Sequence, residues 1–248
     1  MGSNFGTSSN SLASITIADG QSLTTNSHDI DATDIILTGN SLFAISGSSA
    51  TTIVGAIKGA TDGTGTVNVN QDFTLQGSLG TTTNSLSSVI VAASKTLTAN
   101  DQNIDAAIGG VSLANGSVLT LTTGVVTGNV VGASDGVGTV NLNGTSSLGG
   151  GLGGSSSNSL ATIAISASGN ATTNGHDLVA TNITLASGAV LNVSSGTNII
   201  SPIDGTADGN GTVNYLAGTH TTTSAIGTTN DVLAVTVADG TTLTANTA

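Results

Sequence analysis

The sequence has no cysteine, arginine, glutamate or tryptophan, and its 248 residues include one proline. Without cysteine, neither disulfides nor thiolate metal sites can hold the fold, so burial and backbone pairing must do so. Long charged helix formers are nearly absent, and Thr, Ser, Asn, Val and Ile alternate in short runs. This composition predicts strands and turns with almost no helix, and the 35 glycines suit many tight turns.

Positive charge is also scarce, because the only basic side chains are Lys58 and Lys95, against 14 aspartates and a net charge of −12. Phosphate binding depends on clustered Lys and Arg, so we expect no nucleic-acid partner. No run approaches the length of apolar sequence that a membrane-spanning helix needs, and we expect no membrane span. An acidic surface of this kind repels copies of itself and attracts divalent cations.

One short motif occurs three times. The motif, Asp-Gly-x-Gly-Thr-Val-Asn, stands at 62–68, 135–141 and 208–214, so it recurs at a constant step of about 73 residues. A second marker, Asn-Ser-Leu, follows nearly the same step at 10–12, 84–86 and 158–160, with an altered copy at 231–233. Regular recurrence of this length indicates a tandem-repeat protein, in which function depends on length and exposed faces.

The markers divide the chain into segments. We assign 1–9 to a start added for expression and the end of a preceding repeat, 10–83, 84–157 and 158–230 to three repeats, and 231–248 to a partial fourth. Both termini fall inside the repeating pattern, so we interpret the chain as a fragment excised from a longer array.

Each repeat contains a block that alternates apolar and polar residues on either side of a turn, at 15–26, 89–100, 163–174 and 235–246. This is the pattern of strand, turn and strand with one face buried. Val67 is expected to point inward. Two all-β architectures can use such a repeat: a right-handed parallel β-solenoid, with about three coils of ~20–25 residues per repeat, or a string of small β-sandwiches.

Aromatic content favours the solenoid. Only Phe5, Phe43, Phe73 and Tyr215 are present. A small independent sandwich normally needs bulky packing to be stable alone, whereas stacked coils bury Val, Ile, Leu and Ala against the coils above and below.

Two His-Asp pairs occupy one repeat position, His28-Asp29 and His176-Asp177, and the middle copy has Gln102-Asn103 instead. A catalytic pair that every copy used would not change in this way, so we interpret the position as a turn whose side chains bond nearby backbone groups. Asp29 belongs to the densest acidic cluster, with Asp31 and Asp34. Carbohydrate-cleaving β-helices combine such acids with basic groups that stabilise developing negative charge, and no arginine is available. We therefore predict that the protein is not an enzyme.

Asp62, Asp135 and Asp208 are the candidate metal ligands, because each lies in a Gly-flanked turn with free carbonyls nearby. Ca²⁺ is the cation such a turn would take, yet the motif offers one carboxylate where six or more oxygens are needed. The alternative is that each Asp bonds its own turn. We expect no other cofactor.

Several stretches carry a resemblance to a known family: 65–70 and 73–80, followed by Asn84-Ser85-Leu86 and Lys95-Thr96-Leu97-Thr98. They resemble the passenger repeats of large autotransporter adhesins, especially surface antigens of the rickettsial kind, and the resemblance covers most of the chain. It implies a right-handed parallel β-helix exported across the outer membrane and displayed on the bacterial surface. No binding residue carries over, because the family has no short adhesive motif to match.

The sequence thus leads us to expect an extracellular, cell-surface repeat scaffold that acts in attachment, as a stalk or as a coat. Its expected partners are neighbouring repeats, other copies of itself or a receptor on a host surface. The alternative is a self-assembling structural protein such as a surface-layer or matrix filament.

Overall fold

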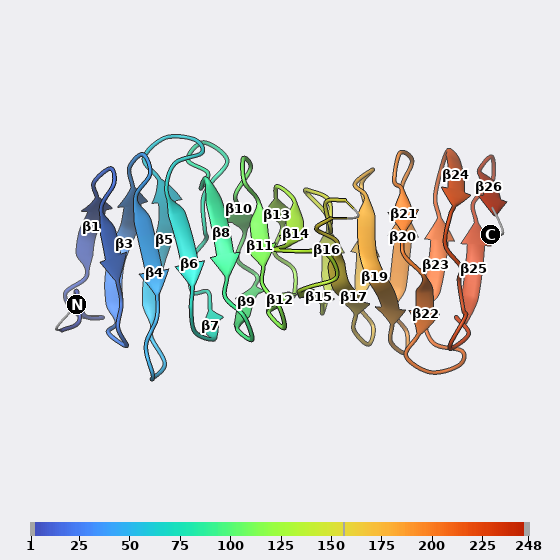
Figure 1. Cartoon of the computed structure of the whole chain (residues 1–248), viewed down its shortest axis with the longest axis horizontal. Helices are drawn as coiled ribbons and strands as arrows, with labels where there is room; N and C mark the ends of the chain where they lie inside the picture. Colours follow the sequence, from blue (N-terminus) through green and yellow to red (C-terminus); the bar gives the residue numbers. More distant parts are fainter. Residues whose placement is uncertain (1–2, 156, 246–248) are drawn as a thin grey trace.

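The computed structural model describes residues 3–155 and 157–245, and in these ranges it contains strands and no helix, so no helix there could cross a membrane. The chain winds into a rod of about eleven coils, with its two ends at opposite ends of the long axis (Figure 1). All strand pairs are parallel and join successive coils. The predicted parallel β-solenoid is confirmed, and the string of separate sandwiches is wrong.

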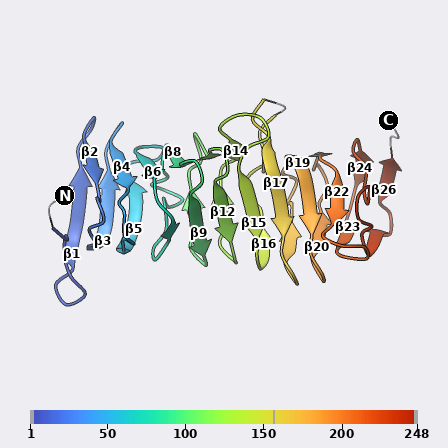
Figure 2. The same ribbon diagram turned by 60° about the horizontal axis from the view of Figure 1, so that its bottom comes forward.

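Every coil visits three sides of the rod in the same order, with a corner after each side; Figure 2 shows the strands following one another along the axis. On side 1 are β7 (Phe73–Thr74), β9 (Thr96–Asn100), β12 (Val118–Leu121), β15 (Thr139–Leu142), β17 (Leu160–Ile165) and β22 (Ile203–Gly205). On side 2 are β1 (Leu12–Ile17), β10 (Ile104–Asp105), β13 (Val126–Thr127), β16 (Thr145–Ser147), β18 (Asn170–Thr172), β20 (Val190–Val193), β23 (Thr212–Tyr215) and β25 (Ala234–Val237). On side 3 are β2 (Ser22–Thr24), β4 (Leu42–Ile45), β6 (Thr66–Val69), β8 (Ser88–Val91), β11 (Val111–Leu113), β14 (Val130–Gly132), β21 (Ile199–Ile200), β24 (Thr219–Thr222) and β26 (Thr242–Ala245). Three longer strands continue around a corner: β3 (Ile30–Leu37), β5 (Ile53–Gly59) and β19 (Leu178–Leu185).

The core is a set of aliphatic columns that run along the rod. On side 3, Phe43 pairs with Val67, Val67 with Val89 and Val89 with Val111, and all four side chains are fully buried. The inward assignment of Val67 is therefore confirmed. Since most strands alternate inward and outward residues, small branched side chains fill the interior between coils, and few aromatic rings are needed.

The sequence repeat and the coil do not coincide. The motif strand lies on side 3 in its first copy (β6), on side 1 in its second (β15) and on side 2 in its third (β23). Each repeat thus contains three coils and one further side, which corrects the expectation of about three coils. Because of the extra side, successive copies are rotated by a third of a turn around the rod.

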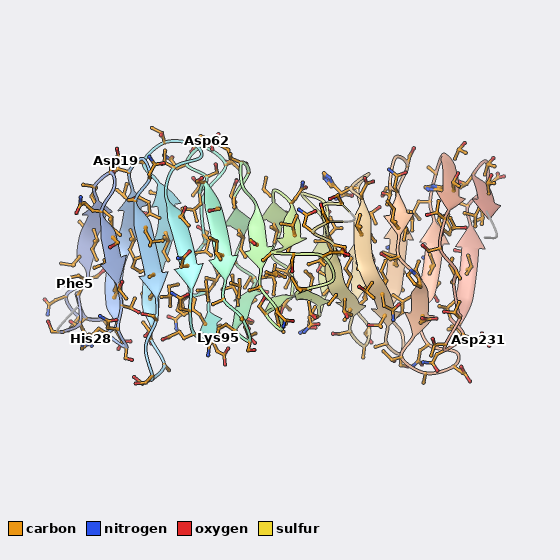
Figure 3. The ribbon with its side chains drawn as sticks, viewed as in Figure 1. Phe5, Asp19, His28, Asp62, Lys95 and Asp231 are labelled. Carbon is orange, nitrogen blue, oxygen red and sulfur yellow. The ribbon has the colours of Figure 1, made fainter. Side chains whose placement is uncertain are left out.

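Side chains at the corners follow this rotation. Asp62, in the first motif, lies at the upper edge of the view in Figure 3, whereas Asp231, whose amide donates to the third motif's Asp208, lies at the lower edge. After three repeats the rotation is complete. The strand β1 and its counterpart β25 accordingly lie on the same side, ten coils apart.

Candidate binding grooves

The three candidate metal ligands stand at three different corners of the rod, and each holds the following coil. Asp62 accepts hydrogen bonds through Oδ1 from the amide and the hydroxyl of Ser85. Asp135 accepts one from the hydroxyl of Ser159, and Asp208 accepts one from the amide of Asp231 at 3.2 Å. The two repeated markers, Asp-Gly-x-Gly and Asn-Ser-Leu, are therefore the two halves of one contact between neighbouring coils.

The contact with Ser85 changes the acidity of the Asp62 carboxyl group. Hydrogen bonds from the Ser85 side chain and amide lower the pKa of Asp62 below its usual 3.8, which keeps it charged. The expectation that each of these Asp side chains bonds its own turn is wrong, because the partners Ser85, Ser159 and Asp231 belong to the next coil. Among the described residues, no three His or Asp side chains gather closely enough to hold a metal ion. That Asp62, Asp135 and Asp208 bind calcium remains a prediction.

The second residue of the His-Asp position also accepts a hydrogen bond from the following coil, in this case from a backbone amide. Asp29 Oδ1 accepts the amide of Thr52 at 2.7 Å, and Asp177 Oδ1 accepts the amide of Asn198 at 2.8 Å. In the middle copy, Asn103 Oδ1 accepts the amide of Val125 at 3.0 Å. An amide oxygen can replace a carboxylate oxygen as an acceptor, which explains the change from Asp to Asn between copies.

The cluster of Asp29, Asp31 and Asp34 is divided among separate roles. Asp34 forms an ion pair with Lys58 on the next coil, with 2.9 Å between Oδ2 and Nζ. Asp29 holds Thr52, and Asp31 lines a groove.

Three grooves of the surface occupy equivalent positions of the repeat. Groove I has a volume of 320 Å³ and groove II a volume of 430 Å³, and groove III is divided into two adjoining hollows of 300 and 480 Å³. Groove I is lined by Asn4, Gly6, Thr7, Ser8, Asp29, Asp31, Thr52 and Val54. The counterparts in groove II are Ser78, Gly80, Thr81, Thr82, Asn103, Asp105, Val125 and Thr127, and those in groove III are Gly151, Gly153, Gly154, Ser155, Asp177, Val179, Asn198 and Ile200.

A glycine shapes each groove. Gly6, Gly80 and Gly153 have φ of 75°, 75° and 81°, in the left-handed region that favours glycine. A Cβ on Gly80 would also lie 2.1 Å from the carbonyl oxygen of Asp105 on the next coil. The chain must therefore turn closely against its neighbour here, and the hydroxyl-bearing residues that follow are left on the rim of the groove.

The chemistry of the grooves is acidic and hydroxyl-rich. Each is lined by at least one Asp and by Ser or Thr, and neither Lys58 nor Lys95 lines any of them. Exposed aliphatic side chains, Val54 and Ile200, lie beside the polar groups in grooves I and III.

Asp105, at the floor of groove II, is 5% exposed, and the structure shows no hydrogen bond to its carboxylate from any described residue. Burial raises the pKa of Asp105, and the nearby negative charge of Asp62 adds to the increase. Asp204 is equally buried but differently placed. Burial alone would raise its pKa, yet hydrogen bonds from Thr229, Thr228 and Asn230 lower it.

The sequence alone did not indicate the grooves. Asp105 stands at the repeat position of Asp31, and the second repeat has uncharged residues where the first has Asp29 and Asp34. The signal that could have located the grooves is the recurrence of Gly6, Gly80 and Gly153 at nearly the same interval as the repeated motif, each followed by Thr-Ser, Thr-Thr or Gly-Ser.

The fold and the grooves define a class: a parallel β-solenoid whose repeat rotates its surface groups around the axis. The chain is similar to a protein named outer membrane protein A from Rickettsia rickettsii, with 34% identity over 251 residues that include 92% of this chain. It spans 11% of that protein's length. No family model and no solved structure matches. The likeness and the solenoid together fit a surface antigen of the rickettsial kind.

Proposed function

We propose that this chain is part of the passenger of a large autotransporter, displayed outside a bacterial cell as a non-enzymatic scaffold for attachment or surface coating. The observation that carries the proposal is the likeness to outer membrane protein A over 92% of the chain. In this proposal the protein acts by contact alone and needs no cofactor. Its partners are neighbouring repeats and a receptor on a host or other surface.

The rotation of the repeat supports display. Grooves I, II and III belong to successive sides of the rod, so a partner that approaches from any direction meets a copy of the same groove. An enzyme usually concentrates its reacting groups in one pocket, whereas several weak copies on one body add through multivalency.

Attachment can be measured with the folded chain coupled to fluorescent beads. We expect these beads to be retained on cultured host cells several-fold more than beads that carry Val67→Asp, whose charge disrupts the buried column. Equal retention would contradict the attachment role.

Electron microscopy distinguishes the scaffold from the filament alternative. Negatively stained protein should form isolated rods of about 50 Å, from about eleven coils at ~4.8 Å each. Long regular fibres would instead favour a self-assembling structural protein.

A further inference from the structure

We propose that groove II is a receptor site for a primary ammonium group, a lysine side chain carried by a basic partner protein, and that grooves I and III repeat the site on the other two sides. The inference deepens the proposed attachment role and rests on it for the source of the partner. It follows from one buried carboxylate and from the groups around it.

Asp105 is a buried residue whose carboxylate has no donor within the described residues. Asp105 as a residue is 5% exposed, and its carboxylate, which lines groove II, receives no hydrogen bond from the described residues, so its negative charge lacks a protein donor. Asp204 shows how this fold satisfies a buried acid with its own donors, namely Thr228 and Thr229. No equivalent donor among the described residues faces Asp105, whose open side is the groove. The donors to this carboxylate are therefore water or a ligand in the groove.

The charge around the groove selects a cation as the donor. Asp62 is close enough to raise the pKa of Asp105 further, and no basic side chain lines the groove. An anionic ligand would be repelled. With a net charge of −12 and only two lysines in the chain, the rod as a whole also attracts basic surfaces.

The shape of the lining selects an ammonium group on an aliphatic stem. An ammonium has three donors, and Asp105 together with the hydroxyls of Thr81 and Thr82 offers acceptors for them. Val125 and Thr127 supply methyl groups along which the methylenes of a lysine can lie. A guanidinium needs a planar, two-oxygen partner, which suits the single deeply placed carboxylate less well.

Grooves I, II and III differ in sequence, but each keeps groups that can bind an ammonium. Groove II has Asn103 where groove I has Asp29, but it retains Asp105. Groove III has Val179 at the Asp105 position, but it retains Asp177 and adds Asp135 from the adjoining corner. Each groove thus keeps a carboxylate beside hydroxyl groups.

The test uses the full chain, labelled with ¹⁵N, and a tetralysine peptide; every peptide carries a blocked α-amino group, so that only side chains differ. We expect saturable shifts of the amide signals of Gly80, Thr81 and Thr82, no such shifts with a peptide acetylated at every Nε, and at least ten-fold weaker binding by tetra-arginine. In Asp105→Asn the affinity at these amides should fall at least ten-fold. The matched control is Asp239→Asn, which removes the same charge from an exposed turn outside the grooves and should leave the affinity unchanged.

Equal loss in both variants would overturn the site and leave only general charge attraction. Unchanged binding in Asp105→Asn, or equal binding of tetra-arginine, would also overturn the assignment. The amide spectrum of each variant reports its fold. If bead attachment persists while the peptide does not bind, the ammonium site fails and the attachment role stands. If the peptide binds and the beads are not retained, the attachment role fails.

Discussion

At the residue scale, the interior distinguishes side chains by whether their polar atoms find partners. Tyr215 is 2% exposed and stacks at a tilt against His220, with 5.1 Å between ring centroids, and its hydroxyl has no hydrogen-bond partner among the described residues. Its counterparts in the other repeats, Val69 and Leu142, are purely apolar. The hydroxyl is therefore a local cost in an otherwise aliphatic column.

Tyr215 is the only tyrosine, so its titration can be followed directly. Burial raises its pKa to about 12. The folded state holds the phenol proton more tightly than the unfolded state, so stability should fall as pH rises from about 10 through about 12. Absorbance at the phenolate band should give this pKa in the folded protein. An ordinary value of about 10 in folded protein would contradict the burial.

Replacing Tyr215 by Phe removes the unpartnered hydroxyl and keeps the ring. We expect the free energy of unfolding to rise by about 1 kcal/mol, and Tm by about 2–4 °C. Calorimetry of the two proteins at neutral pH measures the difference. A lower Tm for Tyr215→Phe would mean that the hydroxyl has a partner.

Asp105 changes the stability with pH in the opposite direction from an acid whose pKa is lowered by hydrogen bonds. Because its pKa is raised, the folded state binds its proton more tightly, and stability from this group increases as pH falls toward 3.8. Asp105→Asn should therefore raise Tm at pH 7, and the gain should shrink on acidification. A gain that is constant over this pH range would contradict a buried charge.

A substitution at Val67 tests whether the aliphatic column of side 3 is buried. Val67→Asp places an unpaired charge at a fully buried position and should cost at least about 3 kcal/mol, lowering Tm by about 6 °C or more. Asn70→Asp adds the same charge at an exposed position just past the same strand and serves as the control. An equal effect of the two changes on the thermal melting curve would contradict the inward placement.

At the element scale, coils are joined by side chains that accept amides from the following coil. Asp29 accepts the amide of Thr52, and Asn103 does the same for Val125 in the second repeat. Asp29→Asn should thus leave Tm within about 1 °C, whereas Asp29→Ala should lower it by about 2 °C, the effect of one lost hydrogen bond of about 1 kcal/mol. Thermal melts of the two variants decide; equal melting points would show that the acceptor has no role.

The strands were predictable from sequence because their physics is local. Alternation in 15–26 and its copies indicated which residues point inward, and the shortage of aromatic rings favoured stacked coils.

The rotation of successive repeats around the rod was not predictable in the same way. Whether one repeat contains nine or ten sides depends on where each corner falls. Corners vary because the coils differ in length: on side 3, Leu23 pairs with Phe43 and Phe43 with Val67, and the second of these steps along the chain is longer than the first.

The grooves were missed for a related reason. Each is built from residues on three successive coils, such as Gly80, Asp105 and Thr127. Their closeness follows only after the register between coils is known. The roles of individual Asp residues were likewise hidden, because Asp105 and Asp204 have similar burial and differ only in the donors that the next coil provides.

At the scale of the whole molecule, one extra side per repeat turns a linear array into a rod with equivalent surfaces all around. Thr61, Ser134 and Ala207 are the exposed residues that precede the three motif aspartates. If each repeat contained three coils and no further side, these three residues would lie along one edge of the rod. With the extra side they lie on three different edges, separated along the axis by about 16 Å per repeat, from about 4.8 Å per coil.

Distances between spin labels at these positions test the rotation most directly, and the absence of native cysteine makes the labelling specific. Pairs of Thr61→Cys, Ser134→Cys and Ala207→Cys would be measured by pulsed electron resonance. We expect the distance between labels 61 and 207 to be clearly shorter than the sum of the 61–134 and 134–207 distances, because the three sites are not collinear. A 61–207 distance equal to that sum would place all three copies on one edge and contradict the rotation of the repeats.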